Sequence, residues 1–310
     1  NVQNYENSTT MGRPGMNKKI VNSYLMADGS RFTDKAGYET MTFDQECQNR
    51  DPRLAQTIRT PGYTRIGSTK KEAPNLAYTM TGYHLIKYSM TANYDEYNKS
   101  CNDIPLFRTA EVYLNYAEAK AELGTLKQAD INKSIKLLRD RVGMTNLDME
   151  LANSKPDPYL MSAATGYPNV KGANQGVILE IRRERTIELA MEGFRYYDIM
   201  RWKEGKLFEN DLLGIYVPGP GTYDLDKDGT DDVCFYVGTK PAGNVPLYLE
   251  IGEQIRLSNG ESGYIICHSL ITKKWNEDRD YLYPVPISER TLSNGVITQN
   301  PGWNDGLNFN

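Results

Sequence analysis

Apolar residues recur at helical spacing in two stretches that follow one another along the chain. In residues 105–124, apolar positions three and four apart predict a helix that ends at Gly124. The same spacing in residues 127–142 predicts a second helix, which Gly143 ends. Two helices joined by so short a turn form a helical hairpin of about 34 residues, the length of a tetratricopeptide unit. We therefore predict a tetratricopeptide-like helix pair over residues 106–144.

A longer apolar pattern occupies residues 176–205 and predicts one long, largely buried helix. Gly193 is expected to bend or break this helix near its middle. The carboxylates Glu184, Glu188 and Glu192 follow one another at helical spacing, with arginines close by in the sequence. This arrangement favours structural ion pairs over a catalytic acid and base. The neighbouring arginines are Arg182, Arg185 and Arg195.

The rest of the chain predicts loops and short extended segments. Residues 1–105 are punctuated by Gly, Pro, Asn, Ser and Thr, which predicts a loop-rich segment. Residues 206–310 alternate in a β-like way and end in turn-forming residues. The predicted fold over residues 1–310 is therefore mainly α, with tetratricopeptide-like helix pairs, long loops and a few short β-strands. The strands are predicted at residues 214–217, 233–237 and 263–266.

Composition and charge exclude several classes of protein. The chain has 310 residues, of which 39% are hydrophobic and 25% charged. No apolar run approaches the ~18 residues that a membrane-spanning helix needs. The net charge of −4 and the absence of a basic patch with interleaved aromatics argue against nucleic-acid binding. Neither an initiator methionine nor a signal peptide is present, so we expect a processed chain or a fragment.

Cysteine and histidine usage gives little support for metal or redox catalysis. The four cysteines, Cys47, Cys101, Cys234 and Cys267, lie far apart and form no C-x-x-C motif. Disulfides are possible if the protein is exported, but the sequence alone does not show which cysteines would be paired. With two histidines, zinc sites and histidine-based triads are poorly supplied. Nucleophile elbows, phosphate-binding loops and zinc-protease motifs are also missing, so we predict no catalytic residue.

The most specific local motif is the acidic run DLDKDGTDD at residues 224–232. Alternating carboxylates followed by a glycine can wrap a loop around a hard cation, because the glycine permits a sharp turn. The twelfth position is Phe235 rather than glutamate, so the loop is not an EF-hand. We predict a structural Ca²⁺ site, and the alternative is an acidic, solvated turn. The predicted ligands are the side chains of Asp224, Asp226, Asp228 and Asp232 and the backbone carbonyl of Thr230.

Tyrosine dominates the aromatic residues, with 22 Tyr against 7 Phe and 3 Trp. A tyrosine offers a flat apolar face and a hydroxyl group, which suits stacking and hydrogen bonding to a polar ligand. Loops often carry binding residues, so loop tyrosines are the candidates for a sugar platform. The alternative is that these tyrosines pack, half-buried, within a loop-rich architecture. The candidates are Tyr63, Tyr94, Tyr97, Tyr159 and Tyr167.

Several segments of the chain resemble the SusD/RagB family. The two most specific are the pattern ER-x-x-EL-x-x-EG-x-R-x-x-D-x-x-RW within residues 178–205 and the terminal Y-P-V-P and QNPGW within residues 281–303. The resemblance covers the chain from about residue 16, and its motifs are scaffold motifs that do not mark a ligand site. The other segments are residues 50–58, 81–88, 102–124 and 131–144.

The resemblance implies a lipoprotein of the outer-membrane surface that binds oligosaccharide or polysaccharide. Such a protein would deliver its ligand to a SusC-like TonB-dependent transporter, without catalysis. Family members are longer and begin at a lipidated cysteine that this chain does not contain, so the chain would be the C-terminal portion, with residues 1–105 on the ligand side. The alternatives are peptide binding, as in RagB-like members, a structural helical-repeat adaptor and, least favoured, a glycoside hydrolase.

Overall fold

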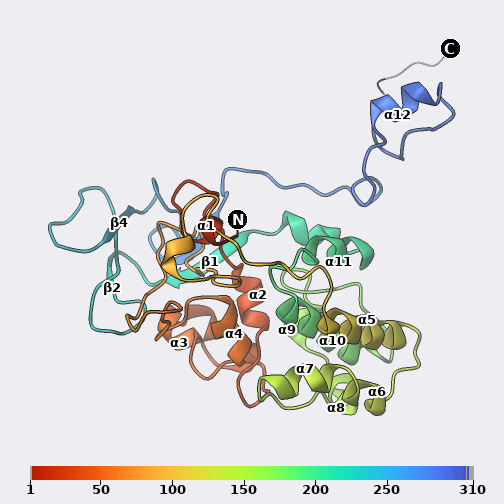
Figure 1. The fold of residues 1–310 in the computed structure, drawn as a ribbon, viewed down its shortest axis with the longest axis horizontal. Helices are drawn as coiled ribbons and strands as arrows, with labels where there is room; N and C mark the ends of the chain where they lie inside the picture. The colour runs from red at the N-terminus through yellow and green to blue at the C-terminus, as the bar shows by residue number, and fades with distance from the viewer. Residues whose placement is uncertain (1, 305, 307–310) are drawn as a thin grey trace.

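The fold is mainly helical, with a few short strands, as predicted. The computed structural model describes residues 2–304 and 306. The longer helices gather at one side of the molecule and the strands at the other, with the N-terminal segment between them (Figure 1). No helix in this part of the chain is both long and apolar enough to cross a membrane.

The N-terminal third consists of short helices separated by loops. Asp51 shows how the local sequence starts one of these helices, because its carboxylate accepts a hydrogen bond from the Arg53 backbone N–H at 2.9 Å. Pro52 follows in the first turn, where its missing N–H costs nothing. The α-helices are α1 (Val2–Glu6), α2 (Lys18–Ser23), α3 (Phe43–Glu46) and α4 (Pro52–Thr57), and the 3₁₀-helices are η1 (Phe32–Asp34), η2 (Tyr38–Thr40) and η3 (Ala92–Tyr94).

The first predicted helix of the hairpin is present, but the second is broken in two. Helix α5 (Thr109–Glu122) starts later than expected, because residues 102–108 are mostly exposed coil. The single helix predicted over residues 127–142 is wrong. Ser134 has a non-helical backbone, and its hydroxyl donates to the Asp130 carbonyl at 2.7 Å, which competes with helix continuation. The two pieces are α6 (Gln128–Asn132) and α7 (Ile135–Arg141), and α8 (Met149–Ser154) and α9 (Pro158–Met161) follow.

The predicted long helix is interrupted at the glycine that was expected to bend or break it. Helix α10 (Gln175–Glu188) is followed by a turn and then by α11 (Arg195–Arg201). In the turn, Gly193 has φ +83° and Met191 has φ +62°, both in the left-handed region that a helix cannot contain. A 3₁₀-helix, η4 (Gly205–Glu209), ends this part of the chain.

Helix α10 is the centre of the helical side of the molecule. Every residue of α10 after Gln175 is buried. The helix packs against α5, α7 and α8 of the helical side and against α2 of the N-terminal segment. Helix α5 packs more extensively against α10 than against α7, so the tetratricopeptide-like arrangement stays a prediction. A helix buried all round that carries several charged residues requires ion pairs for each of them.

The strands form two small sheets. Strand β1 (Leu212–Val217) pairs antiparallel with β5 (Gly263–Cys267). In the other sheet β3 (Val233–Tyr236) is central, with β2 (Gly221–Tyr223) antiparallel and β4 (Leu247–Glu250) parallel to it. The predicted strands correspond to β1, β3 and β5. Strands β2 and β4 were missed, because one has three residues and the other pairs with β3 across a long loop.

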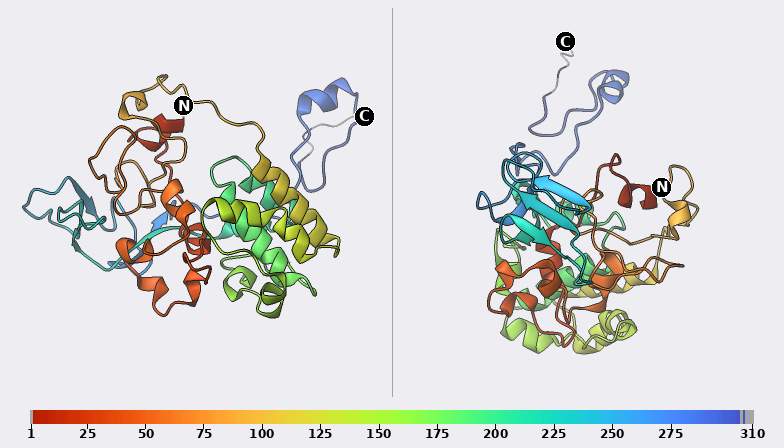
Figure 2. Two further views of the ribbon diagram at one scale, coloured as in Figure 1. Left: turned by 60° about the horizontal axis from the view of Figure 1, so that its bottom comes forward. Right: turned by 90° about the vertical axis from the view of Figure 1, so that its left-hand side faces the viewer.

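The C-terminal segment extends away from the rest of the molecule. Helix α12 (Ile287–Leu292) lies apart from both the helices and the sheets in every view (Figures 1 and 2). Several of its apolar side chains are exposed, among them Leu292 at 83% and Val296, just beyond the helix, at 84%.

Candidate functional site

Two loops of the N-terminal segment are held side by side by Arg65. Its Nε donates to the Met90 carbonyl at 2.6 Å, and its guanidinium group pairs with Asp95. The segment around α1 adds a second tie, because Gln3 Nε2 donates to the Thr91 carbonyl at 2.8 Å while Asn7 Oδ1 accepts from Arg65 at 3.2 Å, and α1 lies beside η3 (Figure 2). We call residues 59–72 and 88–98 the tyrosine loops. These hydrogen bonds fix the two loops relative to each other.

Three of the five predicted tyrosines lie on the tyrosine loops. Tyr97 is 68% exposed, and Tyr94, at the end of η3, is half-buried. Tyr63 is also half-buried, and the Arg59 guanidinium carbon lies 5.4 Å from its ring centre, so the ring is oriented by a cation–π contact. The structure therefore places Tyr63, Tyr94 and Tyr97 on two adjoining loops, and their contact with a ligand stays a prediction.

The other two predicted tyrosines belong to the helical side. Tyr167 is 3% exposed, its ring packs edge-on against Trp202 at 5.3 Å, and its hydroxyl accepts a hydrogen bond from Arg195 at 2.7 Å. Tyr159 is half-buried, with its hydroxyl 3.3 Å from Asn22 Nδ2. Burial removes the ring of Tyr167 from any ligand's reach, and both residues lie outside the tyrosine loops. The composition around them indicated a loop but not that this loop folds onto the core.

A buried polar layer lies next to Arg59 and Arg65. His84 accepts a hydrogen bond from the Asn75 backbone N–H at 3.2 Å through Nδ1, and its Nε2 lies 2.7 Å from the Glu6 carbonyl oxygen. Burial, with the charges of the two arginines, lowers the pKa of His84 to about 3. Burial also raises the pKa of the Glu6 carboxyl to about 7. Both groups are therefore neutral at mildly acidic pH and support the loops as neutral hydrogen-bonding partners.

The carboxylates of α10 form ion pairs, although not with the arginines expected from the sequence. Glu184 accepts from Arg139 Nε at 2.8 Å and also pairs with Arg53. Glu188 pairs with Arg108 at 2.8 Å and with Arg141 at 2.9 Å. The partners come from α4, α7 and the residue before α5, so the pairs join distant segments instead of running along one helix. The prediction of structural ion pairs is therefore confirmed, but Arg182, Arg185 and Arg195, the arginines nearest in the sequence, are not the partners.

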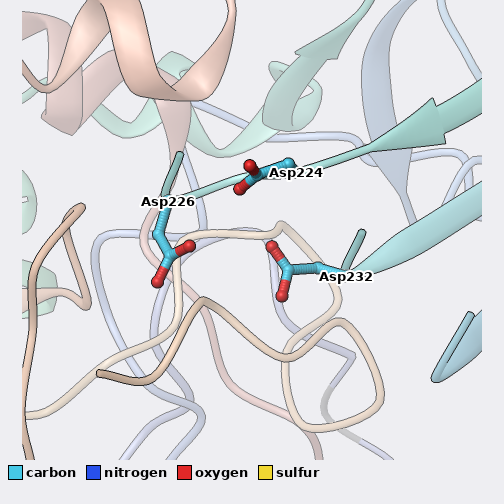
Figure 3. Close-up of side chains that lie close together, drawn as sticks. All are labelled: Asp224, Asp226 and Asp232. Carbon is cyan, nitrogen blue, oxygen red and sulfur yellow. The ribbon is translucent and has the colours of Figure 1, made fainter. Parts of the chain in front are cut away.

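The acidic loop lies between β2 and β3. Tyr223 pairs with Val233 in the antiparallel ladder, so the next residues outward, Asp224 and Asp232, face each other across the start of the loop. One carboxylate oxygen from each of Asp224, Asp226 and Asp232 lies within 4.8 Å of the others. Figure 3 shows the three side chains gathered around a common space.

Hydrogen bonds from the loop's own backbone orient these carboxylates. Asp224 accepts from the Gly229 N–H at 2.8 Å, and Asp232 accepts from the Leu225 N–H at 2.8 Å. Burial, together with the negative charge of Asp226, raises the pKa of Asp232 to about 6. The hydrogen bond from the Leu225 N–H opposes this rise. Burial also raises the pKa of Asp226.

Two of the predicted calcium ligands are not among these three carboxylates, and for Thr230 the predicted ligand is a backbone carbonyl, which stays a prediction. Asp228 is exposed, and its carboxylate accepts from the Thr230 backbone N–H at 2.8 Å, so it stabilises the turn. Thr230 is exposed as well. Gly229, between them, has φ +92°, the left-handed conformation for which glycine was expected at this position.

An aromatic cluster that the sequence pattern did not predict lies beside the C-terminal segment. Tyr196 of α11 contacts Tyr283 and Phe208, with ring centres 6.4 and 5.7 Å apart. Phe208 in turn contacts Trp275 at 5.3 Å, and Tyr283 is 64% exposed. The density of aromatic residues between positions 275 and 283 was a signal, but their contact with α11 is long-range and leaves no trace in the local pattern.

Comparison with known proteins places the chain in a family. The sequence matches the model of the SusD family over residues 1–303. This chain belongs to the SusD family. The resemblance seen in the sequence motifs is thereby confirmed. No curated protein matches the chain.

Two solved structures of SusD-like proteins have a similar fold. One is a SusD-like protein from Bacteroides fragilis NCTC 9343, with a TM-score of 0.55 and 22% identity, covering 93% of this chain and 47% of the other. The other, from the same organism, is described as a SusD-like carbohydrate-binding protein, with a TM-score of 0.53, 23% identity and coverage of 89% and 47%. At these identities the likeness concerns the fold. The chain spans about half the length of both SusD-like proteins.

Proposed function

We propose that this SusD-family chain binds a glycan on its tyrosine loops. As part of a lipid-anchored protein of the outer-membrane surface, it would pass that glycan to a SusC-like TonB-dependent transporter and would catalyse no reaction. Membership of the SusD family supports this proposal, and so does the carbohydrate-binding description of one structurally similar protein. The strongest support from the molecule itself is the way Arg65 fixes the two tyrosine loops side by side.

The chemistry of the tyrosine loops suits a sugar. An aromatic ring face binds the apolar C–H face of a pyranose, while neighbouring polar groups bind its hydroxyl groups. Tyr97 offers a largely exposed ring, and the Arg59–Glu72 ion pair, with N and O atoms 3.0 Å apart, lies beside Tyr63. Glu72 is partly exposed, so it remains accessible as a hydrogen-bond acceptor.

The ion pairs of Glu184 and Glu188 favour a structural role over a hydrolytic one for these carboxylates. A glycosidase needs two carboxylates that are free to donate a proton and to act as base or nucleophile. Glu184 and Glu188 are instead fixed between arginines, and the arginines Arg53 and Arg139 lower the pKa of Glu184 to about 2 although burial opposes them. Such a group holds its charge at neutral pH and cannot serve as a general acid.

Electrophoresis in native gels cast with a panel of polysaccharides tests the proposal. We expect one class of polysaccharide to retard the chain, compared with a gel lacking polysaccharide, and we expect no release of reducing ends from it. Retardation by none of them, together with binding to a peptide library, would replace glycan by peptide as the ligand. Release of reducing ends that tracks the protein concentration would contradict the non-catalytic assignment.

A further inference from the structure

The acidic loop between β2 and β3 holds three carboxylates that form no salt bridge in the described part of the chain, and Lys71 is the cation whose charge acts on Asp226. Asp224, Asp226 and Asp232 each bring an oxygen atom within 4.8 Å of the others. In the described part of the chain, no other group of three or more histidine, cysteine or acidic side chains comes together in this way. Three like charges at such distances repel one another unless a cation or protons neutralise them. The geometry therefore calls for a neutralising partner.

Asp226 gives a second and independent indication. Its side chain is 6% exposed, and its Oδ2 atom is buried with no hydrogen-bond partner. Its other oxygen, Oδ1, accepts a bond from the Asp228 N–H at 3.3 Å. Buried carboxylates in proteins are paired with cations or coordinate metals, because desolvating an unpaired charge is costly. Figure 3 shows one oxygen atom of the Asp226 carboxylate turned towards the space that it shares with Asp224 and Asp232.

We propose that Asp224, Asp226 and Asp232 bind a Ca²⁺ ion. All three donors are hard oxygen atoms, which suit Ca²⁺ and Mg²⁺ and do not attract metals that prefer nitrogen or sulfur ligands. Ca²⁺ accepts six to eight oxygen ligands in irregular geometry, so backbone carbonyls of the loop and water can complete the shell. The left-handed residues Lys227 and Gly229, with φ +59° and +92°, curl the backbone into a tight turn of the kind that such loops use.

Bound calcium would anchor the small sheet to the protein core. Leu225 lies between two of the ligands, is 6% exposed and belongs to the core cluster that also contains Val233 and Phe235 of β3. Its N–H donates to Asp232, so the ligand at the far end of the loop is already tied to it. An ion that joins both ends of the loop would stabilise the β2–β3 hairpin and the packing of Leu225 in the core.

The ligand assignment supplies its own matched control. Asp226 has an unpartnered buried oxygen, whereas Asp228 is exposed and bonds within the turn. Asp226→Asn should therefore abolish calcium binding, while Asp228→Asn should leave most of it. Removing one charge from a metal-free cluster of like charges relieves repulsion, so in chelator Asp226→Asn should melt at the same temperature as the wild type or higher. That comparison separates loss of the ion from loss of the fold.

The experiment uses the chain freed of metal with chelator and then titrated with CaCl₂, followed by calorimetry and thermal unfolding. At a Ca²⁺ concentration a hundredfold above Kd, the wild type and Asp228→Asn should melt about 5 °C higher, because an ion that binds only the folded state stabilises it. Asp226→Asn should show neither heat of binding nor a rise in melting temperature.

Three outcomes would overturn the proposal. The first is a wild-type melting temperature that does not respond to Ca²⁺, with no heat of binding. The second is an Asp226→Asn variant that responds to Ca²⁺ as the wild type does. The third is a rise in melting temperature and a heat of binding with MgCl₂ equal to those with CaCl₂, which would contradict the assignment of Ca²⁺ as the ion. None of these outcomes depends on glycan binding, so the ion site and the proposed function are tested separately.

Discussion

Glu184 provides the sharpest test of how the N-terminal segment is held to the helical side of the molecule. The residue is 0% exposed and joins Arg53 of α4 to Arg139 of α7. Burial alone would raise its pKa, but the two arginines outweigh burial and lower it from 4.5 to about 2. At ~1.4 kcal/mol per pKa unit, this difference corresponds to about 3 kcal/mol of stability at neutral pH.

Glu184→Gln keeps the size of the side chain and removes its charge. The glutamine amide group can accept from one guanidinium group, but its NH₂ then faces the other, which leaves a buried positive charge without its partner. Removing one member of a buried ion pair typically costs roughly 3–5 kcal/mol. Arg53 retains its bonds to Asp51 and Glu188, so we expect a loss of about 3 kcal/mol, at the lower end of that range.

The assay is urea unfolding of the wild type, Glu184→Gln and a control, Asp140→Asn. Asp140 pairs with Lys136 on the surface, where the two side chains are 48% and 41% exposed, so its loss should cost below ~0.5 kcal/mol. The pKa of Glu184 is lower in the folded state, so its contribution is complete above pH 4.5 and is lost as the pH falls towards 2. A Glu184→Gln loss equal to that of the control, or one that stays constant from pH 6 to pH 3, would refute the reasoning.

Two further predictions concern stability. His84 has a pKa of about 3 in the fold against 6.5 unfolded, so the wild type should lose up to ~1.4 kcal/mol of stability per pH unit as the pH falls through this range. His84→Gln should lack the part of this pH dependence that comes from His84. Identical pH profiles of the free energy of unfolding for the wild type and His84→Gln would contradict the prediction. A Cβ atom at Gly176 would lie 1.8 Å from the Ala152 carbonyl oxygen, so Gly176→Ala should cost ~2 kcal/mol or more. An unchanged melting temperature of that variant would contradict the close packing of α10 on α8.

Local patterns were sufficient to predict the main helices. The apolar spacing predicted α5 and α10, and Gly193 marked the break before α11. The break between α6 and α7 was missed, because it involves one hydroxyl group, that of Ser134, in competition with the backbone. Hydrophobic periodicity does not register such a bond.

Long-range contacts explain most of what the sequence did not reveal about the sites. The acidic loop is local, so its spacing correctly predicted a cluster of carboxylates, although not which of them converge. The partners of Glu184 lie 131 and 45 residues away in the sequence and come together only through folding. In the same way, composition marked Tyr63 and Tyr167 alike as loop tyrosines, while packing left Tyr63 half-buried and buried Tyr167.

The most direct test of glycan binding on the tyrosine loops is calorimetric titration with an oligosaccharide from the polysaccharide that retards the chain in gels. Tyr97→Ala and Tyr63→Ala should each weaken binding by roughly 1–3 kcal/mol, which is about five- to 150-fold in affinity, without changing the melting temperature. Tyr197→Ala is the matched control, because Tyr197 is 64% exposed but belongs to α11. Wild-type affinity in both loop variants, or loss of affinity in Tyr197→Ala alone, would contradict the account.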